Sequence, residues 1–445
     1  MSSPSVSNLP KLEESLPVID SARQAYLDQV KLLSDRIVKA QQPIRILDAI
    51  NWDDSIKEHF FAHQCQQLPP VDQAYYQKRP LRFEPSPLKR EFHDIEREIT
   101  RTLGQLNPLA NIMRRMCREY QTVIRMLEKR GTEDFADYAQ ELYGSSSDVF
   151  HAGDPTIAQL GEMVEETLSN LLEHQSMQED ARTIEAADAV AWLNARAQDA
   201  FPNAGVRVIL DDGIASDAAA GNDYIKIRKG ATFNLRDLEI LEVHEGWVHL
   251  GTTLNGMSQP YCTFLSKGPP SATITQEGLA VLTEILTLRS GPRRLHKLIS
   301  RVRAVTLAEQ GANFCDVFHY LREHDLDAEQ SYIVASRVFR GSTPTGAPFT
   351  KDITYIKGFI LTYNYLRIAV AQGKLDRLPL LFLGKTVLED MRVLADLVEE
   401  GTVVAPTFIP PYLKDCKGLA TWLSFSRFIG NLNFSQLEAD YGQII

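Results

Sequence analysis

Two histidines, His244 and His249, lie five residues apart within one predicted helix, and this spacing constrains the fold more than any other sequence feature. The helix is predicted over residues 234–256, because Asn234 is a favourable N-cap and Asn255-Gly256 is a favourable end. On a regular α-helix, at ~100° per residue, two such side chains point roughly 140° apart. In that geometry they cannot easily bind one metal ion.

A local widening of the helix would remove this difficulty. One residue inserted as a π-bulge turns both imidazoles towards the same face, and Gly246 and Gly251 would ease the distortion. The pattern His-Glu-x-x-x-His therefore has two interpretations. It is either a metal-binding pair on an irregular helix or two ordinary histidines in the core or in solvent.

The metal-binding interpretation points to zinc hydrolysis. A catalytic zinc ion is held by neutral imidazoles and a further ligand, with one position left for water. A carboxylate beside that water must take its proton. Glu245, directly after His244, is the candidate for this role.

A third ligand should come from a second helix, which is predicted to begin near Thr275 after a Pro/Gly-containing loop. Glu277 lies in its first turn and is the candidate, although a carboxylate there could simply favour the helix N-terminus. Gly278 would allow the two helices to approach closely. Glu284, seven residues further on, could orient a histidine, but an exposed charge is the expected fate for it.

The rest of the chain is predicted to be mostly helical, including residues 11–40, whereas about the first ten residues, rich in Ser and Pro, are predicted to be disordered. Strands are predicted at 206–210 and 224–228, joined by an acidic, Ala/Gly-rich loop over 211–223. The expected class is mostly α (α+β), with a small sheet beside the HExxxH helix. We divide the chain into an N-terminal arm (1–40), a helical region (41–150) and a catalytic region (151–445).

Composition narrows the functional class. The net charge of −11 argues against a surface for nucleic acid or anionic lipid, and no apolar stretch approaches the ~20 residues that span a membrane. The N-terminus has no secretory signal. Five widely spaced cysteines without a CxxC pattern are typical of a reduced cytoplasm.

The HExxxH pattern followed by Gln276-Glu-Gly-Leu-Ala280 resembles the QEGLA-motif family of zinc metallopeptidases, which is related to the microtubule-associated tyrosine carboxypeptidases. The resemblance extends over about residues 40–430 and includes Arg340-Gly and the pattern FTKDxxYxxG over 349–358. Trp247 stands where a smaller aliphatic residue is expected. Dipeptidyl peptidase III shares the HExxxH pattern, but its glutamate-rich second motif is not found here.

The resemblance implies a zincin-like enzyme in which His244, His249 and Glu277 bind Zn²⁺ and Glu245 is the general base and acid. The expected reaction is removal of a C-terminal residue from a peptide or protein, with Tyr or another aromatic residue as the candidate.

Further roles follow from what such a reaction needs. Tyr355 and Lys351 are candidates to stabilise the oxyanion. Arg337, Arg340 and Lys351 are candidates to bind the substrate's terminal carboxylate. Two alternatives stay open, a zinc-binding regulatory protein without peptidase activity and a helical scaffold without metal. The sequence does not predict an oligomeric state.

Overall fold

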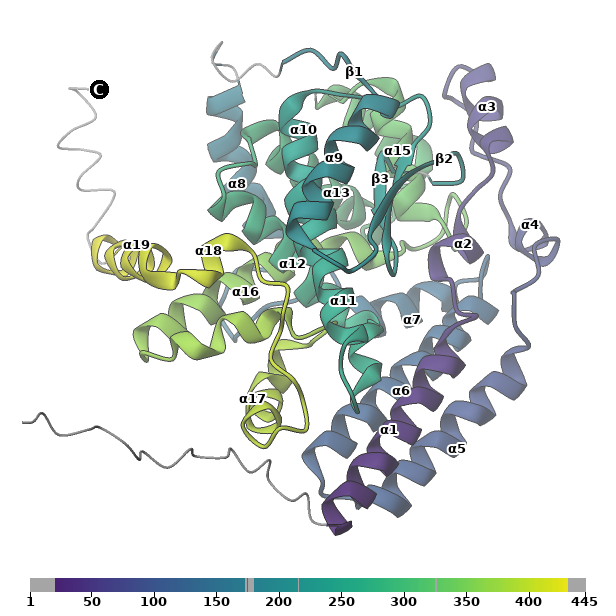
Figure 1. Ribbon diagram of the computed structural model, residues 1–445. Helices are drawn as coiled ribbons and strands as arrows, with labels where there is room; N and C mark the ends of the chain where they lie inside the picture. Colours follow the sequence, from purple (N-terminus) through teal and green to yellow (C-terminus); the bar gives the residue numbers. More distant parts are fainter. Residues whose placement is uncertain (1–20, 173, 175–179, 215, 325, 431–445) are drawn as a thin grey trace, which may run out of the picture.

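A computed structural model describes residues 21–172, 174, 180–214, 216–324 and 326–430 (Figure 1). The disorder predicted for the first residues lies outside this range, as does part of the helix predicted over 11–40. The described part of that helix is α1 (Ser21–Gln41). The described residues are mostly helical with two small sheets, so the predicted class is confirmed.

The N-terminal region consists of helices whose longest members lie side by side (Figure 1). Proline occupies the first turn of α5 and α6, where its missing N–H leaves no helix hydrogen bond unmade. Buried apolar side chains such as Val30, Phe92 and Val123 join α1, α5 and α6 in one cluster. After α1 the helices are α2 (Ile46–Ile50), α3 (Asp54–Ala62), α4 (Gln73–Gln77), α5 (Pro85–Leu103), α6 (Pro108–Glu128) and α7 (Asp134–Tyr143).

A three-stranded sheet in the order β2-β4-β3 follows in the middle of the chain, with β2 parallel and β3 antiparallel to β4. Both predicted strands are present, as β2 and β4. β3 lies within the segment that we predicted to be a loop. The sequence did not predict this strand because its three alanines give no strand signal. The elements are α8 (Ile157–Leu172), β1 (Ile184–Glu185), α9 (Ala186–Ala200), β2 (Arg207–Asp211), β3 (Ala218–Ala220), β4 (Tyr224–Arg228) and β5 (Thr232–Phe233), which pairs with β1.

The HExxxH segment is one continuous helix made of α10 (Leu235–Leu241), the π-helix η2 (Glu242–Leu250) and α11 (Gly251–Met257). Asn234 and Asp237 form a reciprocal capping box at its start. The predicted irregularity is present, but it is nine residues of π-helix instead of a single bulge. The sheet lies beside this helix, as predicted, through contacts of β3 and β4 with η2.

The predicted end of this helix is only approximate, because Asn255 and Gly256 both lie inside its last turn. The Asn255 amide instead bonds the backbone of Phe382 and Phe408. A Cβ at Gly256 would lie 2.3 Å from the carbonyl oxygen of Leu265. Both residues therefore serve close packing against distant loops.

The helix that carries Glu277 is α12 (Pro270–Leu286), and it packs most extensively against α16 (Thr354–Ala371) near the centre of Figure 1. Gly278 was predicted to let this helix approach the HExxxH helix, but the atoms nearest to it belong to α16. A Cβ there would lie 1.9 Å from the carbonyl carbon of Gly358. The pair of glycines lets the two helix backbones touch.

The remaining elements are α-helices and short 3₁₀ helices. They are η3 (Thr263–Ser266), α13 (Pro292–Glu309), α14 (Phe314–Glu323), α15 (Ala328–Phe339), η4 (Thr350–Ile353), η5 (Leu375–Arg377), η6 (Pro379–Phe382), η7 (Leu388–Asp390), α17 (Met391–Glu399), α18 (Pro411–Lys414) and α19 (Cys416–Ile429). Of the helices in the described ranges, none is long and apolar enough to cross a membrane.

One apolar cluster contains residues from both sides of position 150, for example Phe135 and Tyr143 together with Leu279 and Phe349. The core is therefore continuous across the boundary that we propose between the helical region (41–150) and the catalytic region (151–445). The division remains a prediction about chain organisation.

Candidate metal centre

The π-helix brings the two motif histidines together. The ring centroids of His244 and His249 are 4.8 Å apart, with the ring planes at 84°. The Nε2 atom of each imidazole lies 3.7 Å from the same carboxylate oxygen, Oε2 of Glu277. Ligand atoms of these three residues all lie within 4.8 Å of one another. The wide helical turn thus places both imidazoles on one face of the helix, which a regular α-helix would not do.

Glu277 lies in the second turn of α12 and not in the first, because the helix begins at Pro270. Its position therefore does not reflect a simple preference for the helix N-terminus. Its Oε1 atom accepts a hydrogen bond of 2.8 Å from Lys351 Nζ. Burial disfavours the carboxylate, but the charge of Lys351 and the bonds from the histidines outweigh it and hold the pKa of Glu277 well below its usual range.

A buried carboxylate orients His244. Its Nδ1 donates a hydrogen bond of 2.6 Å to Oε1 of Glu284, which is 0% exposed. Arg294 donates two further bonds to Glu284, of 2.9 and 3.1 Å. Burial opposes the charge of Glu284, but Arg294 and His244 lower its pKa to about 2. The expectation that Glu284 is an exposed charge is wrong.

The donor set fits a zinc ion. Two imidazole nitrogens and one carboxylate oxygen are the ligands of many catalytic zinc sites, and the second nitrogen of His244 is bonded to a carboxylate as in such sites. The electrostatics agree with a cation at this point. Burial opposes charge on His244, yet Glu277 and Glu284 outweigh it and raise its pKa to about 10.

Glu245 lies beside the three converging residues and is held by the sheet. The backbone N–H of Ala220, in β3, donates a hydrogen bond of 2.8 Å to Oε2 of Glu245. Its Oε1 atom has no hydrogen-bond partner within the described ranges. One oxygen is thus fixed, and the other is available to accept a proton.

The candidates for oxyanion and carboxylate binding lie in different surroundings. Lys351 Nζ is bonded to Glu277 and lies 5.7 Å from the ring centroid of Tyr355. Tyr355 is buried, and its hydroxyl forms no hydrogen bond with any residue of the described part. Arg337 forms a bidentate pair with Asp352, at 2.6 and 2.7 Å.

Arg340 points towards the N-terminal region instead of the metal centre. It bonds Asn51 Oδ1 at 3.2 Å and lies over the ring of Phe349. Burial and the nearby charge of Arg337 lower the pKa of Arg340 to about 10. The structure therefore places Lys351 on Glu277 and Tyr355 beside Lys351, whereas Arg337 and Arg340 already have protein partners.

Sequence reasoning missed Arg301, on α13. Its guanidinium carbon lies 5.3 Å from the ring centroid of Tyr355, and its Nε atom is buried without a hydrogen bond. Within the described ranges Arg301 has no ion-pair or hydrogen-bond partner. Burial lowers its pKa, and the nearby charge of Arg337 adds to the effect. No motif contains Arg301, so only its unpaired burial identifies it.

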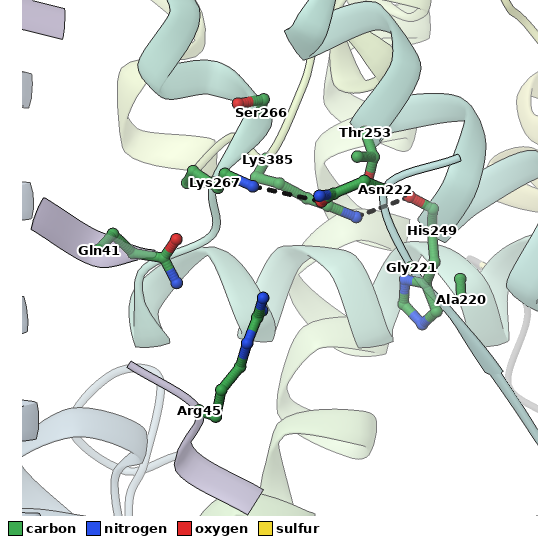
Figure 2. A pocket seen from close by; sticks show the side chains of 10 residues that line it. All are labelled: Gln41, Arg45, Ala220, Gly221, Asn222, His249, Thr253, Ser266, Lys267 and Lys385. Carbon is green, nitrogen blue, oxygen red and sulfur yellow. Dashed lines mark hydrogen bonds between the residues drawn. The ribbon is translucent and has the colours of Figure 1, made fainter. Parts of the chain in front are cut away.

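His249 also lines a hollow of about 250 Å³ (Figure 2). Its lining includes Ala220 of β3 and three cations, Arg45, Lys267 and Lys385, but no carboxylate. Lys267 donates a hydrogen bond of 3.2 Å to Asn222 Oδ1. In a chain with a net charge of −11, this hollow is locally positive.

Lys385 is a second residue that the sequence did not reveal. Its Nζ atom bonds the backbone carbonyl of His249 at 2.8 Å across 136 residues of chain (Figure 2). Burial lowers the pKa of Lys385 to about 7, although the carboxylates of Glu245 and Glu277 oppose this shift.

Trp247, the departure from the expected motif, lies away from the hollow. It is buried, and its ring packs 5.2 Å from that of Phe201. Both belong to the apolar cluster between the sheet and the HExxxH helix. Trp247 therefore fills the core behind the metal centre.

Comparisons with known proteins identify the family of the chain. No curated protein sequence matches the chain. A solved structure titled "BsuCP Crystal Structure" is similar over 91% of this chain and 98% of its own, with 12% identity and a TM-score of 0.38. A family model described as microtubule-associated tyrosine carboxypeptidase matches residues 58–431. Because that match covers most of the sequence, this chain belongs to the microtubule-associated tyrosine carboxypeptidase family, a family of carboxypeptidases.

Proposed function

We propose that this protein is a zinc-dependent carboxypeptidase that removes a C-terminal residue from a peptide or protein. The observation that carries the proposal is the convergence of His244, His249 and Glu277 on one point, with Glu245 beside them. The three would bind Zn²⁺, which supplies Lewis-acid activation of water and of the scissile carbonyl when bound. Five free cysteines fit the reduced cytoplasm in which we place the protein.

Glu245 would carry the proton. Its Oε1 atom takes a proton from the attacking water and then delivers it to the nitrogen of the leaving amino acid. The bond from Ala220 N–H engages Oε2 and leaves Oε1 without a hydrogen-bond partner in the described ranges, so Oε1 is the oxygen that we propose for the proton transfers.

Tyr355 and Lys351 would stabilise the negative charge that develops on the scissile carbonyl oxygen. We propose the Tyr355 hydroxyl as the donor, because Lys351 already bonds Glu277. Lys351 would then hold Glu277 in place and contribute its positive charge. Its contact with the Tyr355 ring links the two.

Arg301 is the residue that we propose for the substrate's terminal carboxylate, in place of Arg337 and Arg340. A guanidinium binds a carboxylate through two parallel hydrogen bonds. Arg301 lies over the Tyr355 ring with a buried Nε atom, and it has no hydrogen-bond or ion-pair partner within the described ranges. Arg337 is committed to Asp352. The carboxylate of a bound substrate would supply the negative charge that pairs with Arg301.

The cationic hollow beside His249 supports an acidic substrate. Arg45 and Lys267 line it together with Ala220 of the edge strand β3, where a peptide could extend away from the metal centre. Residues that precede the cleaved bond would therefore be acidic, despite the net charge of −11. The family description names tyrosine, and we propose a C-terminal tyrosine, or another aromatic residue, as the residue removed.

A peptide series tests the proposal. Peptides that end in each amino acid, as free acid or as C-terminal amide, and with Glu-Glu or Ser-Ser before the last residue, are incubated with zinc-loaded protein. We expect release of the last residue from free acids, fastest for Glu-Glu-Tyr, and none from amides or with His249→Ala. Zinc binding without release from any peptide would indicate the regulatory protein without peptidase activity.

A further inference from the structure

The carbonyl group of His249 lies where the π-helix η2 gives way to the regular helix α11, and it accepts two short side-chain bonds. The hydroxyl of Thr253 donates to it at 2.7 Å, and Lys385 Nζ donates to it at 2.8 Å. The hydroxyl of Thr252 lies further away, at 3.2 Å, and is closer to the carbonyl oxygen of Val248, at 2.6 Å. The backbone of a candidate ligand is therefore fixed from outside its own helix.

The same ammonium group reaches the second candidate helix. Lys385 Nζ bonds Oε1 of Gln276 at 3.0 Å, and Gln276 directly precedes Glu277 on α12. Thr252 closes the arrangement, since its hydroxyl lies 2.9 Å from Gln276 Oε1 and 3.1 Å from Lys385 Nζ. Thr252 is 0% and Gln276 5% exposed. One lysine thus joins the two helices that carry His249 and Glu277.

Lys385 is itself held firmly. Its backbone N–H donates a hydrogen bond of 2.7 Å to the carbonyl oxygen of Leu265. The preceding Gly384 is pressed against the same carbonyl, because a Cβ there would lie 2.5 Å from it. The loop that carries Lys385 is therefore docked on the backbone, and its side chain enters a polar site already prepared for three hydrogen bonds.

We propose that Lys385 is a positioning residue that sets the separation of His249 and Glu277 by bonding the His249 carbonyl and the Gln276 side chain together. The inference rests on the proposed function. All three ammonium protons have acceptors on the two ligand-bearing helices, so Lys385 acts through these helices and not by contact with substrate. It also gives Gln276 a physical role beside Glu277.

The test is the zinc affinity of Lys385→Met, measured by competition with a chelator. Methionine keeps an unbranched side chain as far as Cε and removes the ammonium group with its three donors, so we expect a loss of roughly 10- to 100-fold in affinity, the range for residues that support a metal ligand. Lys267→Met is the matched control. Lys267 lines the same hollow but bonds only Asn222 among the described residues, so its replacement should leave zinc affinity unchanged.

A second variant tests the same bond from its other end, in case Lys385→Met does not fold. Gln276→Met removes the acceptor on α12 and should also weaken zinc binding. The variant with both substitutions should bind zinc only slightly less tightly than the single variant with the lower affinity. Additive losses would show that the two side chains act separately and would overturn the inference.

Kinetics and the wild-type control separate the remaining outcomes. Unchanged zinc affinity in Lys385→Met, with a raised KM alone, would make Lys385 a substrate contact and reject the inference while the proposed function stands. Failure of the wild-type protein to bind zinc would reject both. Circular dichroism of each variant confirms the fold in which affinity is measured.

Discussion

The metal centre and the cationic hollow share His249 and Lys385, yet they are built in opposite ways. In the metal centre, the second polar atoms of His244 and Glu277 have protein partners, Glu284 and Lys351. In the hollow, Arg45 is exposed and makes no hydrogen bond or ion pair within the described ranges. The first region is fixed before any substrate arrives, whereas the second leaves the charge of Arg45 available.

This difference matches the tasks that we propose for the two regions. Chemistry requires atoms held within a fraction of an ångström, which buried and mutually bonded side chains provide. Recognition of a peptide stretch tolerates movement and relies on charge over a longer range. Substitutions in the metal centre should therefore change rate or metal affinity, and substitutions in the hollow should change KM.

The largest expected effect comes from Glu245→Gln in the metal centre. Loss of a general base should lower kcat by roughly 10²- to 10⁴-fold. The amide oxygen can still accept the Ala220 N–H bond, and zinc content should be retained. Turnover and bound zinc are measured on the same preparation. Full turnover by this variant would show that the mechanism is wrong.

Glu284→Gln should weaken zinc binding by roughly 10- to 100-fold, because the neutral amide supports His244 less well than a carboxylate does. Chelator competition measures the loss. Glu309→Gln is the control, since Glu309 also accepts bonds, from Ser146 and Gln140, but touches no candidate ligand. Equal effects of the two substitutions would argue against a specific role for Glu284.

Gly278→Ala tests how far the metal centre depends on the touching backbones of α12 and α16. The added Cβ would overlap Gly358, and overpacking of this kind typically lowers the free energy of unfolding by about 1–3 kcal/mol. Gly418→Ala, in a helix where a Cβ meets nothing within 4 Å, should not destabilise the protein. Denaturant unfolding of both variants checks this. Equal stability of the two would remove the proposed reason for Gly278.

The smallest effect should come from the hollow. Arg45→Ala or Lys267→Ala should raise KM for acidic peptides only a few-fold, because exposed charge pairs contribute about 0.2–1 kcal/mol. The difference should shrink at high salt and be absent for peptides without acidic residues. Arg427→Ala, on exposed α19, is the control. A fall in kcat instead of a rise in KM would contradict the separate roles that we propose for the two regions.

The local parts of this arrangement could be predicted from the sequence. The spacing of His244 and His249 required a widened helix, and Asn234 marked its start. Both depend on residues close together in the chain. The length of the π-helix was not predictable, because it depends on contacts that the segment makes with the sheet and α12.

Partners that are distant in sequence account for what could not be predicted. Glu284 was expected to be an exposed charge, although a role in orienting a histidine was the alternative, because the partners that surround it, His244 and Arg294, are brought to it by the fold. Lys385 belongs to no motif. Arg301 emerges only when burial and the absence of a partner are known together. Polar residues in cores are recognised by their partners, and those come from the fold.

The central claim is that His244, His249 and Glu277 bind a metal ion, and its most direct test is metal analysis of the purified protein beside His244→Ala. The account predicts one zinc ion per chain in the wild-type protein and loss of it in the variant, with both proteins folded. Equal metal content in the two proteins, or none in either after incubation with zinc, would contradict the account and favour the helical scaffold without metal.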